Sequence, residues 1–316
     1  MSRKPFIVQI APLGEWADAC LRERYEVLPL WRESEPLACL AARGAGARVA
    51  VTSVRYGCSA QMMALMPELE AICSWGVGYE TIDLGAARAR GIQVSYTPDV
   101  LDGCVADLAW GLLIATARRI AEGDRYVRGG QWRTIGAFPL STRVGGKRLG
   151  ILGMGRIGEA IARRGQGFDM QVAYHNRGPR AGSPYRFEPS LAALADWADF
   201  LVVACVGGPA THHLVSAQII EALGPQGILV NIARGTVIDQ DAMVAALAAG
   251  RLGGAGLDVL EREPAVPDAL KALDSVVLMP HVGSATHETR RDMAQLVIDN
   301  AASYLQGRGL ITPIRD

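Results

Sequence analysis

Short apolar runs alternate with segments of helical periodicity along the first third of the chain. The runs predict strands at residues 5–11, 48–54, 69–74 and 91–96. Segments 14–25 and 82–90 between them have the spacing of helices. Strands that alternate with helices predict a parallel sheet covered on both faces.

The pattern breaks at Thr97-Pro98-Asp99 and then resumes. Apolar residues recur at helical spacing over residues 101–120, and a connector rich in glycine and aromatic residues follows at 126–146. A second series of strands is predicted at residues 148–152, 171–175, 200–206, 227–232, 254–259 and 276–279. A last helix is expected over residues 288–305, with no strand after it.

The two series predict an α/β protein with two doubly wound Rossmann-like domains. Six strands with intervening helices match a doubly wound nucleotide-binding fold, so residues 99–283 are expected to form a dinucleotide-binding domain. The last helix should pack back on the first series. The substrate domain, flavodoxin-like, is therefore expected to be discontinuous and to comprise residues 1–98 and 284–316.

Composition narrows the class of protein. The 32 basic residues balance 32 acidic ones, so no basic surface argues for nucleic acid or an anionic membrane. The longest apolar runs are too short to span a bilayer, and the N-terminus lacks the pattern of a signal peptide. The six cysteines have no C-x-x-C or ligand spacing, which predicts buried free thiols, no metal site and a cytoplasmic enzyme.

A glycine-rich turn lies between the predicted strand at 148–152 and the next helix. It reads Gly153-Met154-Gly155-Arg156-Ile157-Gly158, a G-x-G-x-x-G in the setting of a dinucleotide fingerprint. Gly153 allows the tight turn, Gly155 lets the backbone approach a pyrophosphate, and Gly158 lets helix pack on strand. The N–H groups of the helix N-terminus would face the phosphates.

The strand after this turn indicates which dinucleotide binds. NAD-selective folds place an acidic residue about 20 residues on, where it accepts hydrogen bonds from the ribose hydroxyl. This chain has Asn176, then Arg177 and Arg180, and arginine can pair with a 2′-phosphate. NADP(H) is therefore the favoured coenzyme, with NAD(H) also open. The alternative is a solvated loop with incidental arginines.

Three polar residues follow the ends of late strands, where open α/β sheets place their sites. Arg234 can hold a substrate carboxylate and its carbonyl oxygen, and His281 can exchange a proton with that oxygen. A carboxylate such as Glu263 would hold the other ring nitrogen of the histidine and fix its tautomer. Singly, each is more often an ordinary surface or loop residue. Together, they point to reduction of a 2-keto acid.

These motifs resemble the D-isomer-specific 2-hydroxyacid dehydrogenases, in the hydroxypyruvate/glyoxylate and hydroxyphenylpyruvate reductase branch. The segments that carry the resemblance span nearly the whole chain in order: residues 74–79, 97–101, 153–158, 231–235, 258–264 and 280–286. The resemblance implies that Arg234, Glu263 and His281 are the catalytic set, with His281 as the acid/base. It also implies a homodimer formed through the 100–145 region.

The same resemblance implies further site residues. The backbone of Val77 and Gly78 would bind the substrate carboxylate, and Trp75, where the branch often has another residue, would set the size of the pocket. The residues expected beside the nicotinamide and ribose are Val206, Thr211, Ile232 and Asp258. Arg55 faces either the same cleft or solvent. His212, His213 and His287 are interpreted as structural or surface residues, with no evident carboxylate partner for the first two.

The predicted function is an NADPH-preferring reductase of glyoxylate or hydroxypyruvate that produces D-2-hydroxy acids. An arylpyruvate or 2-ketogluconate is the alternative substrate. Formate dehydrogenases resemble the chain as well, but they have glutamine where this chain has Glu263. A different class, a dinucleotide-sensing protein of corepressor type on the same fold, would not need the intact set of Arg234, Glu263 and His281.

Overall fold

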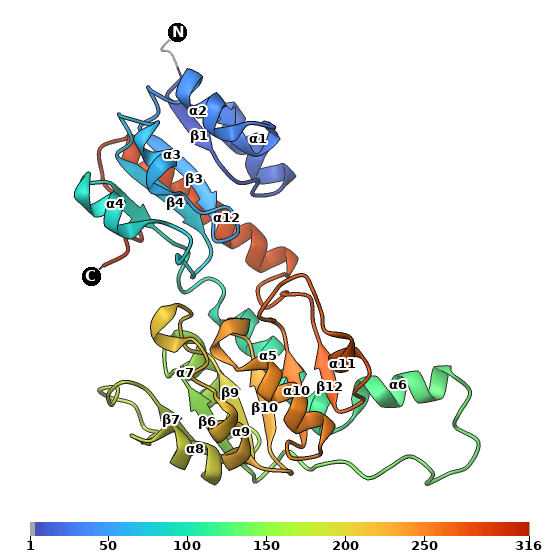
Figure 1. The fold of residues 1–316 in the computed structure, drawn as a ribbon. Helices are drawn as coiled ribbons and strands as arrows, with labels where there is room; N and C mark the ends of the chain where they lie inside the picture. The colour runs from blue at the N-terminus through green and yellow to red at the C-terminus, as the bar shows by residue number, and fades with distance from the viewer. Residues whose placement is uncertain (1–3, 316) are drawn as a thin grey trace. The chain divides into compact units, whose positions relative to one another are not determined.

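The computed structural model describes residues 4–315 and divides the chain into two compact units (Figure 1). One unit comprises the residues up to Leu101 together with those from Ala285 onward, and the other is Asp102–Ser284. The sequence placed these divisions at 98/99 and 283/284. Residues 1–3 and 316 of the expected first domain lie outside the described residues.

The first unit is built on a parallel sheet of five strands in the order β2-β1-β3-β4-β5, the flavodoxin-like order. The strands are β1 (Phe6–Gln9), β2 (Glu26–Pro29), β3 (Val49–Ser53), β4 (Ala71–Trp75) and β5 (Gln93–Ser95). The helices are α1 (Glu15–Arg24), the 3₁₀ turn η1 (Leu30–Arg32), α2 (Pro36–Arg43), α3 (Ala60–Ala64), α4 (Leu84–Ala89) and α12 (His287–Leu305).

Both faces of this sheet are covered, because neighbouring strand residues point to opposite sides. Ile7 packs in a cluster with Leu21 of α1 and Val297 of α12, whereas Val8 packs with Leu40 of α2 and Met63 of α3. The last helix of the chain therefore completes the core of the first unit.

The second unit is built on a parallel sheet of seven strands in the order β12-β11-β10-β9-β6-β7-β8. The strands are β6 (Arg148–Leu152), β7 (Gln171–His175), β8 (Arg186–Phe187), β9 (Phe200–Val203), β10 (Ile228–Asn231), β11 (Gly254–Leu257) and β12 (Val276–Leu278). The strand order reverses between β6 and β9, where open sheets of this kind bind their ligands. The predicted fold class is confirmed.

The helices of this unit are α5 (Asp102–Ala117), α6 (Ile120–Arg128), α7 (Arg156–Gln166), α8 (Leu191–Trp197), α9 (Ala217–Leu223), α10 (Gln240–Ala248) and α11 (Asp268–Lys271). Two 3₁₀ turns, η2 (Pro209–Thr211) and η3 (Gly235–Val237), follow β9 and β10. No helix within residues 4–315 is both long and apolar enough to cross a membrane.

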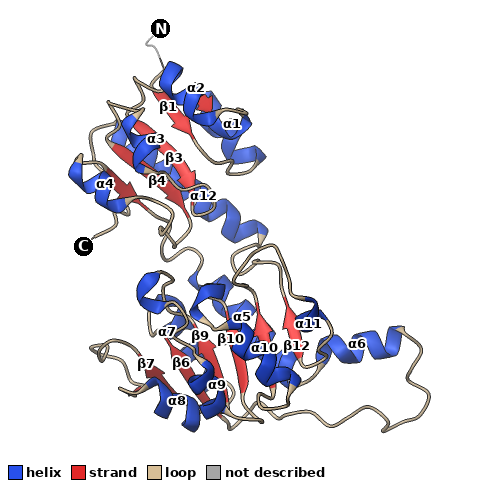
Figure 2. Cartoon of the chain, viewed as in Figure 1, coloured by secondary structure: helices blue, strands red, loops and turns tan. Residues whose placement is uncertain are grey.

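Several elements differ from the prediction. One helix was expected over residues 101–120, but α5 ends at Ala117 and a left-handed residue, Arg119 with φ 53°, separates it from α6. Helix α6 was missed because it is short and none of its side chains is buried, and its last residues were assigned to the connector at 126–146. The edge strands β2 and β8 were missed because they are short and partly exposed. Figure 2 marks the helices in blue and the strands in red.

Candidate active site

The three glycines of the turn after β6 differ in the space around them. Gly153 has φ 102°, and a Cβ there would lie 2.5 Å from Cα of Cys205. A Cβ on Gly158 would clash with the carbonyl oxygen of Gly153. In contrast, no atom lies within 4 Å of the position that a Cβ on Gly155 would take. The middle glycine therefore borders open space, as close approach of a pyrophosphate requires.

Helix α7 begins in this turn with Arg156 and Ile157. Its N-cap, Gly155, has no side chain to satisfy the N–H groups of the first helical turn. An anion bound in the open space would accept hydrogen bonds from these groups and meet the positive end of the helix dipole. The residues present thus fit the pyrophosphate of a dinucleotide.

The loop after β7 braces the glycine turn. The side chain of Asn176 accepts a hydrogen bond from the backbone N–H of Met154 at 2.7 Å. The guanidinium of Arg180 donates to the carbonyl oxygens of Met154 and Gly155, at 3.2 and 3.1 Å, and pairs with a glutamate of α7. Arg177 lies exposed on the same loop. Asn176 and Arg180 therefore shape the turn, whereas the side chain of Arg177 is exposed to solvent.

The loop after β9 holds two of the residues expected beside the coenzyme. Val206 is 74% exposed, which is unusual for valine. The hydroxyl of Thr211 donates to the carbonyl oxygen of Val206 at 2.9 Å and holds the loop in a closed turn. Ile232, after β10, is buried at 8% exposure. The loop therefore presents an exposed apolar side chain at Val206.

The segment after β10 carries Arg234. The buried side chain of Asn231 fixes it from both ends, since it accepts from the N–H of Ala233 and donates to the carbonyl oxygen of Arg234, each at 3.0 Å. Gly207, in the loop after β9, leaves space for the arginine stem, because a Cβ there would lie 2.5 Å from Cγ of Arg234. The arginine is thus positioned by two neighbouring strand ends.

His281 and Glu263 form the hydrogen-bonded pair that the sequence predicted. Nδ1 of His281 lies 2.7 Å from Oε2 of Glu263, and because a carboxylate only accepts, this nitrogen carries the proton of the bond. Oε1 of Glu263 accepts from the N–H of Leu260 at 3.2 Å. The histidine side chain is 31% exposed. The pair fixes the tautomer and leaves Nε2 for a reacting group.

Asp258 organises the loop that carries His281. Its carboxylate, 2% exposed, accepts hydrogen bonds from the consecutive N–H groups of Val282 and Gly283 at 2.7 and 2.8 Å. Its carbonyl oxygen accepts from the N–H of His281, which has φ 55°. Burial raises the pKa of Asp258, and the two backbone hydrogen bonds oppose that rise. The sequence indicated Asp258 only as a residue beside the coenzyme, and this positioning role was missed.

The three loops that carry Arg234, Glu263 and His281 leave adjacent strands. Strand β11 pairs in parallel with β10 on one side and with β12 on the other. Their carboxyl ends therefore lie at one edge of the sheet, the edge from which the glycine turn also leaves. An arginine, a hydrogen-bonded histidine and a dinucleotide turn at one edge can bind a carboxylate and protonate a carbonyl oxygen beside a hydride donor.

The expected substrate-binding residues of the first unit follow β4. Gly76 is tied to Thr97 by two hydrogen bonds, at 2.9 and 3.0 Å, which fix the course of the loop that contains Val77 and Gly78. The guanidinium of Arg290 lies 4.8 Å from the ring centre of Trp75. Among the described residues no partner satisfies the buried Nε1 of Trp75. The loop has a defined shape within its own unit.

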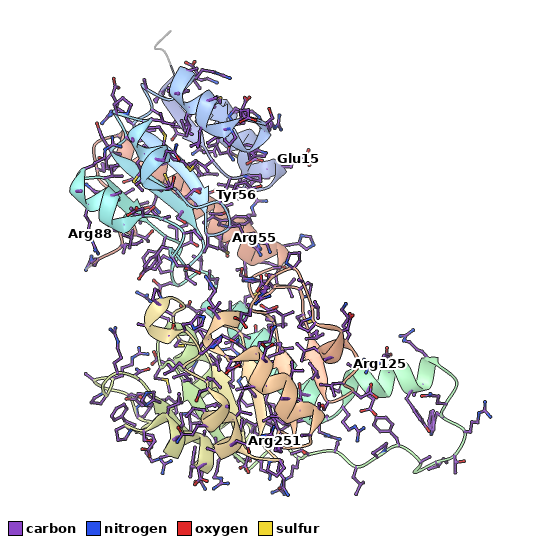
Figure 3. The ribbon with its side chains drawn as sticks, in the orientation of Figure 1. Glu15, Arg55, Tyr56, Arg88, Arg125 and Arg251 are labelled. Atoms are coloured by element: carbon purple, nitrogen blue, oxygen red, sulfur yellow. The ribbon has the colours of Figure 1, made fainter. Side chains whose placement is uncertain are left out.

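Arg55 lies on the turn after β3, next to Tyr56. Both side chains are exposed there, as Figure 3 shows. The exposed side chain agrees with the expectation that Arg55 faces solvent.

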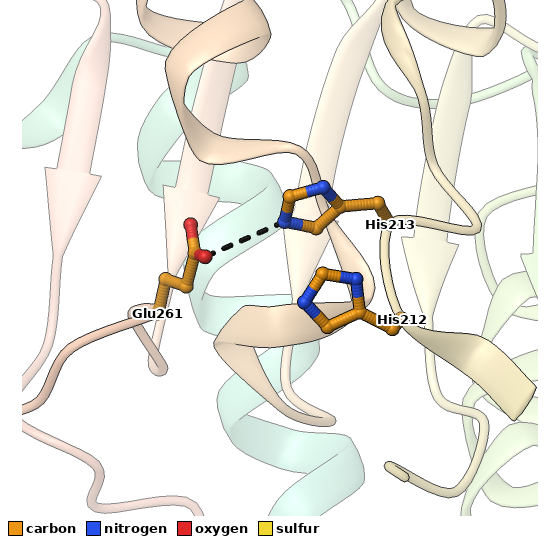
Figure 4. A group of neighbouring side chains, drawn as sticks. All are labelled: His212, His213 and Glu261. Carbon is orange, nitrogen blue, oxygen red and sulfur yellow. Dashed lines mark hydrogen bonds and ion pairs between the residues drawn. The ribbon is translucent and has the colours of Figure 1, made fainter. Parts of the chain in front are cut away.

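His213 has a carboxylate neighbour that was not evident from the sequence, since its Nε2 lies 3.4 Å from Oε1 of Glu261 (Figure 4). The two residues are 48 positions apart, so only the fold brings them together. His287 lies exposed at the start of α12.

The family model for the D-isomer specific 2-hydroxyacid dehydrogenase NAD-binding domain matches residues 110–283. The chain is 42% identical to the hydroxyphenylpyruvate reductase of Plectranthus scutellarioides over 98% of both chains. It is 41% identical to the 2-ketogluconate reductase of Gluconobacter oxydans, over 99% of this chain and 100% of that one.

A solved structure extends the comparison to the fold. The NADPH-dependent glyoxylate/hydroxypyruvate reductase of Sinorhizobium meliloti, in complex with NADP and malonate, superposes with a TM-score of 0.89 at 38% identity. The superposition covers 98% of this chain and 97% of that one. The likeness therefore extends over both units of the chain.

Proposed function

The chain belongs to the reductase branch of the D-isomer-specific 2-hydroxyacid dehydrogenase family, and we propose that it reduces glyoxylate and hydroxypyruvate to D-2-hydroxy acids with NADPH. The observation that carries the proposal is the 2.7 Å hydrogen bond between His281 and Glu263 at the sheet edge that also carries Arg234 and the glycine turn. This pair would supply a proton donor, His281, at the edge of the sheet where a coenzyme of this fold presents its nicotinamide.

In the proposed mechanism, Arg234 binds the carboxylate of the keto acid and polarises its carbonyl group. The reduced coenzyme, when bound, supplies the hydride for the carbonyl carbon. Nε2–H of His281 donates a proton to the carbonyl oxygen, and Glu263 stabilises the ring through Nδ1–H. Glu263 stays ionised throughout, and His281 regains its proton from solvent.

The coenzyme is proposed to lie along the glycine turn, with its pyrophosphate before the N-terminus of α7. Val206, Thr211, Ile232 and Asp258 would line the nicotinamide side, and Arg177 would pair with the 2′-phosphate. The exposure of Arg177 and the lack of an acidic residue at position 176 support NADPH over NADH. NADH would bind the same turn without that ion pair.

We also propose a homodimer formed through the 100–145 region. Helix α6 has no buried side chain, and Ile135 and Leu140 beyond it are 91% and 97% exposed. Apolar side chains this exposed, on a segment that extends from the rest of its unit (Figure 1), favour burial against a second copy. Light scattering should give twice the mass of the chain, and a monomer would refute this part.

The cysteines bear on the cellular compartment of the protein. No disulfide bond joins two cysteines within residues 4–315, and cysteines without disulfide bonds are typical of a reducing compartment. We therefore propose a cytoplasmic location.

The function is tested by steady-state kcat/KM for glyoxylate, hydroxypyruvate, hydroxyphenylpyruvate and 2-ketogluconate, each with NADPH and with NADH. The two small acids with NADPH should give the highest values. A preference for one of the larger acids would replace the proposed substrate class but keep the reaction. Binding of NADPH without turnover of any acid would favour a dinucleotide-sensing protein.

A further inference from the structure

Two loops of the second unit bring three metal-binding side chains together, apart from the proposed catalytic pair. His212 and His213 follow η2 in the loop after β9, and Glu261 lies in the loop after β11. One ring nitrogen from each histidine and one carboxylate oxygen all lie within 4.8 Å of one another. We propose that these three residues form a site for a transition-metal ion, Zn²⁺ in the first place.

The backbone holds the two histidines in an unusual way. Neighbouring residues of an extended chain point to opposite sides, but here the two rings stack at 4.0 Å between centroids with an angle of 26° (Figure 4). His213 achieves this with φ 50°, a left-handed conformation that is uncommon outside glycine. Its N–H donates to the carbonyl oxygen of Thr236 at 2.8 Å, which keeps the conformation in place.

The separation of His213 and Glu261 suits a shared ion better than a direct ion pair. Their 3.4 Å distance is long for a charge-assisted hydrogen bond, which spans about 2.7–2.9 Å. Tetrahedral zinc with bonds of about 2.0–2.1 Å holds its ligand atoms about 3.4 Å apart. A ring nitrogen of His212 lies within 4.8 Å of the other two ligand atoms, and its side chain is exposed.

The ligand chemistry selects the class of ion. Two imidazoles and one carboxylate favour zinc and its neighbours, whereas magnesium and calcium prefer sites of oxygen atoms alone. Three protein ligands leave the fourth position for water. The backbone N–H of Glu261 donates to the buried side chain of Gln240 at 3.2 Å, so the carboxylate comes from a fixed loop. The site is therefore largely formed before an ion arrives.

An ion at this site would tie the loop after β9 to the loop after β11. The first loop carries Val206 and Thr211, and the second carries Glu263 two residues beyond Glu261. If the proposed function holds, occupancy would restrict both loops beside the coenzyme. Metal binding itself does not depend on that function and is measured without turnover.

The test is calorimetric titration of Zn²⁺ into the full chain and into three variants, His212→Ala, Glu261→Gln and the control His287→Ala. His287 is also exposed but lies in the first unit, outside the cluster. The wild type and the control should bind one ion per chain, and the two ligand variants should bind at least about tenfold more weakly. Circular dichroism checks that each variant is folded.

A second measurement identifies the ligands. Co²⁺ bound in the same place should give the visible spectrum of a tetrahedral site and lack the near-ultraviolet band of cobalt–thiolate ligation, and Zn²⁺ should displace it. Unchanged zinc affinity in the ligand variants, a thiolate band, or absence of binding in the wild type would each overturn the proposal.

Discussion

The backbone N–H of His281 donates to the carbonyl oxygen of Asp258 at 2.9 Å, while the carboxylate of Asp258 holds the next two N–H groups of the chain. One buried aspartate thus determines the course of the backbone through the histidine. His281 has φ 55°, and these three hydrogen bonds maintain that conformation. The orientation of the proton donor depends on Asp258 as well as on Glu263.

The variant Asp258→Asn should separate activity from stability. An amide can accept only one of the two N–H bonds, so the loop shifts and kcat/KM should fall about tenfold or more. Because burial raises the pKa of Asp258 above 3.8, ionisation of its carboxyl group destabilises the folded wild type as the pH rises from 3.8 to the raised pKa. The thermal midpoint of the variant relative to that of the wild type should therefore increase over that interval and stay constant above it. A variant with full activity would contradict the positioning role.

Gly207→Ala should weaken substrate binding through Arg234. The added methyl group would lie 2.5 Å from Cγ of the arginine and push its side chain from the place that Asn231 sets. We expect kcat/KM for the keto acid to fall about tenfold or more, with little change in NADPH affinity. Gly46→Ala is the control, because nothing lies within 4 Å of its Cβ position. Equal kinetics in both variants would show that Gly207 does not position Arg234.

The two arginines after β7 should behave differently. Arg177→Ala removes only a partner for the 2′-phosphate, so KM should rise about 10- to 100-fold for NADPH and stay unchanged for NADH. Arg180→Ala removes the bonds to the carbonyl oxygens of Met154 and Gly155, so KM should rise for both coenzymes. Steady-state kinetics with each coenzyme checks the pattern. If Arg177→Ala raised KM for both equally, the basis for NADPH preference would be lost.

Three of the six thiols should resist modification at neutral to mildly alkaline pH. Burial raises the pKa of Cys58 and Cys73 to about 12 and that of Cys205 to about 11. The thiolate is the reactive form, and at pH 8 only about one Cys205 side chain in a thousand is a thiolate. Peptide mapping after brief treatment with an aromatic disulfide should find the label on Cys20, Cys39 and Cys104. Early labelling of Cys205 would contradict its raised pKa.

Much of the candidate site could be predicted from local sequence, because the site residues directly follow predicted strands. A Cβ at Gly153 or Gly158 would clash with backbone atoms, so both positions require glycine. Apolar runs located the strands before and after them. The hydrogen bond between His281 and Glu263 could be predicted because a glutamate and a histidine on neighbouring strand ends suit one another chemically.

Long-range contacts are what the sequence could not supply. Nothing local reveals that His213 meets Glu261, that Gly207 makes room for Arg234, or that Asp258 holds the loop after β12. Helix α6 was missed for the opposite reason. None of its side chains is buried within its own unit, so nothing in the core of that unit required a helix at residues 120–128.

The most direct test of the account is NADPH oxidation by His281→Asn with glyoxylate and hydroxypyruvate, together with a fluorescence titration of NADPH. Asparagine cannot pass a proton to the substrate oxygen, so kcat should fall by about 10²- to 10⁴-fold while NADPH binds as in the wild type. The account would be contradicted if the variant kept the turnover of the wild type.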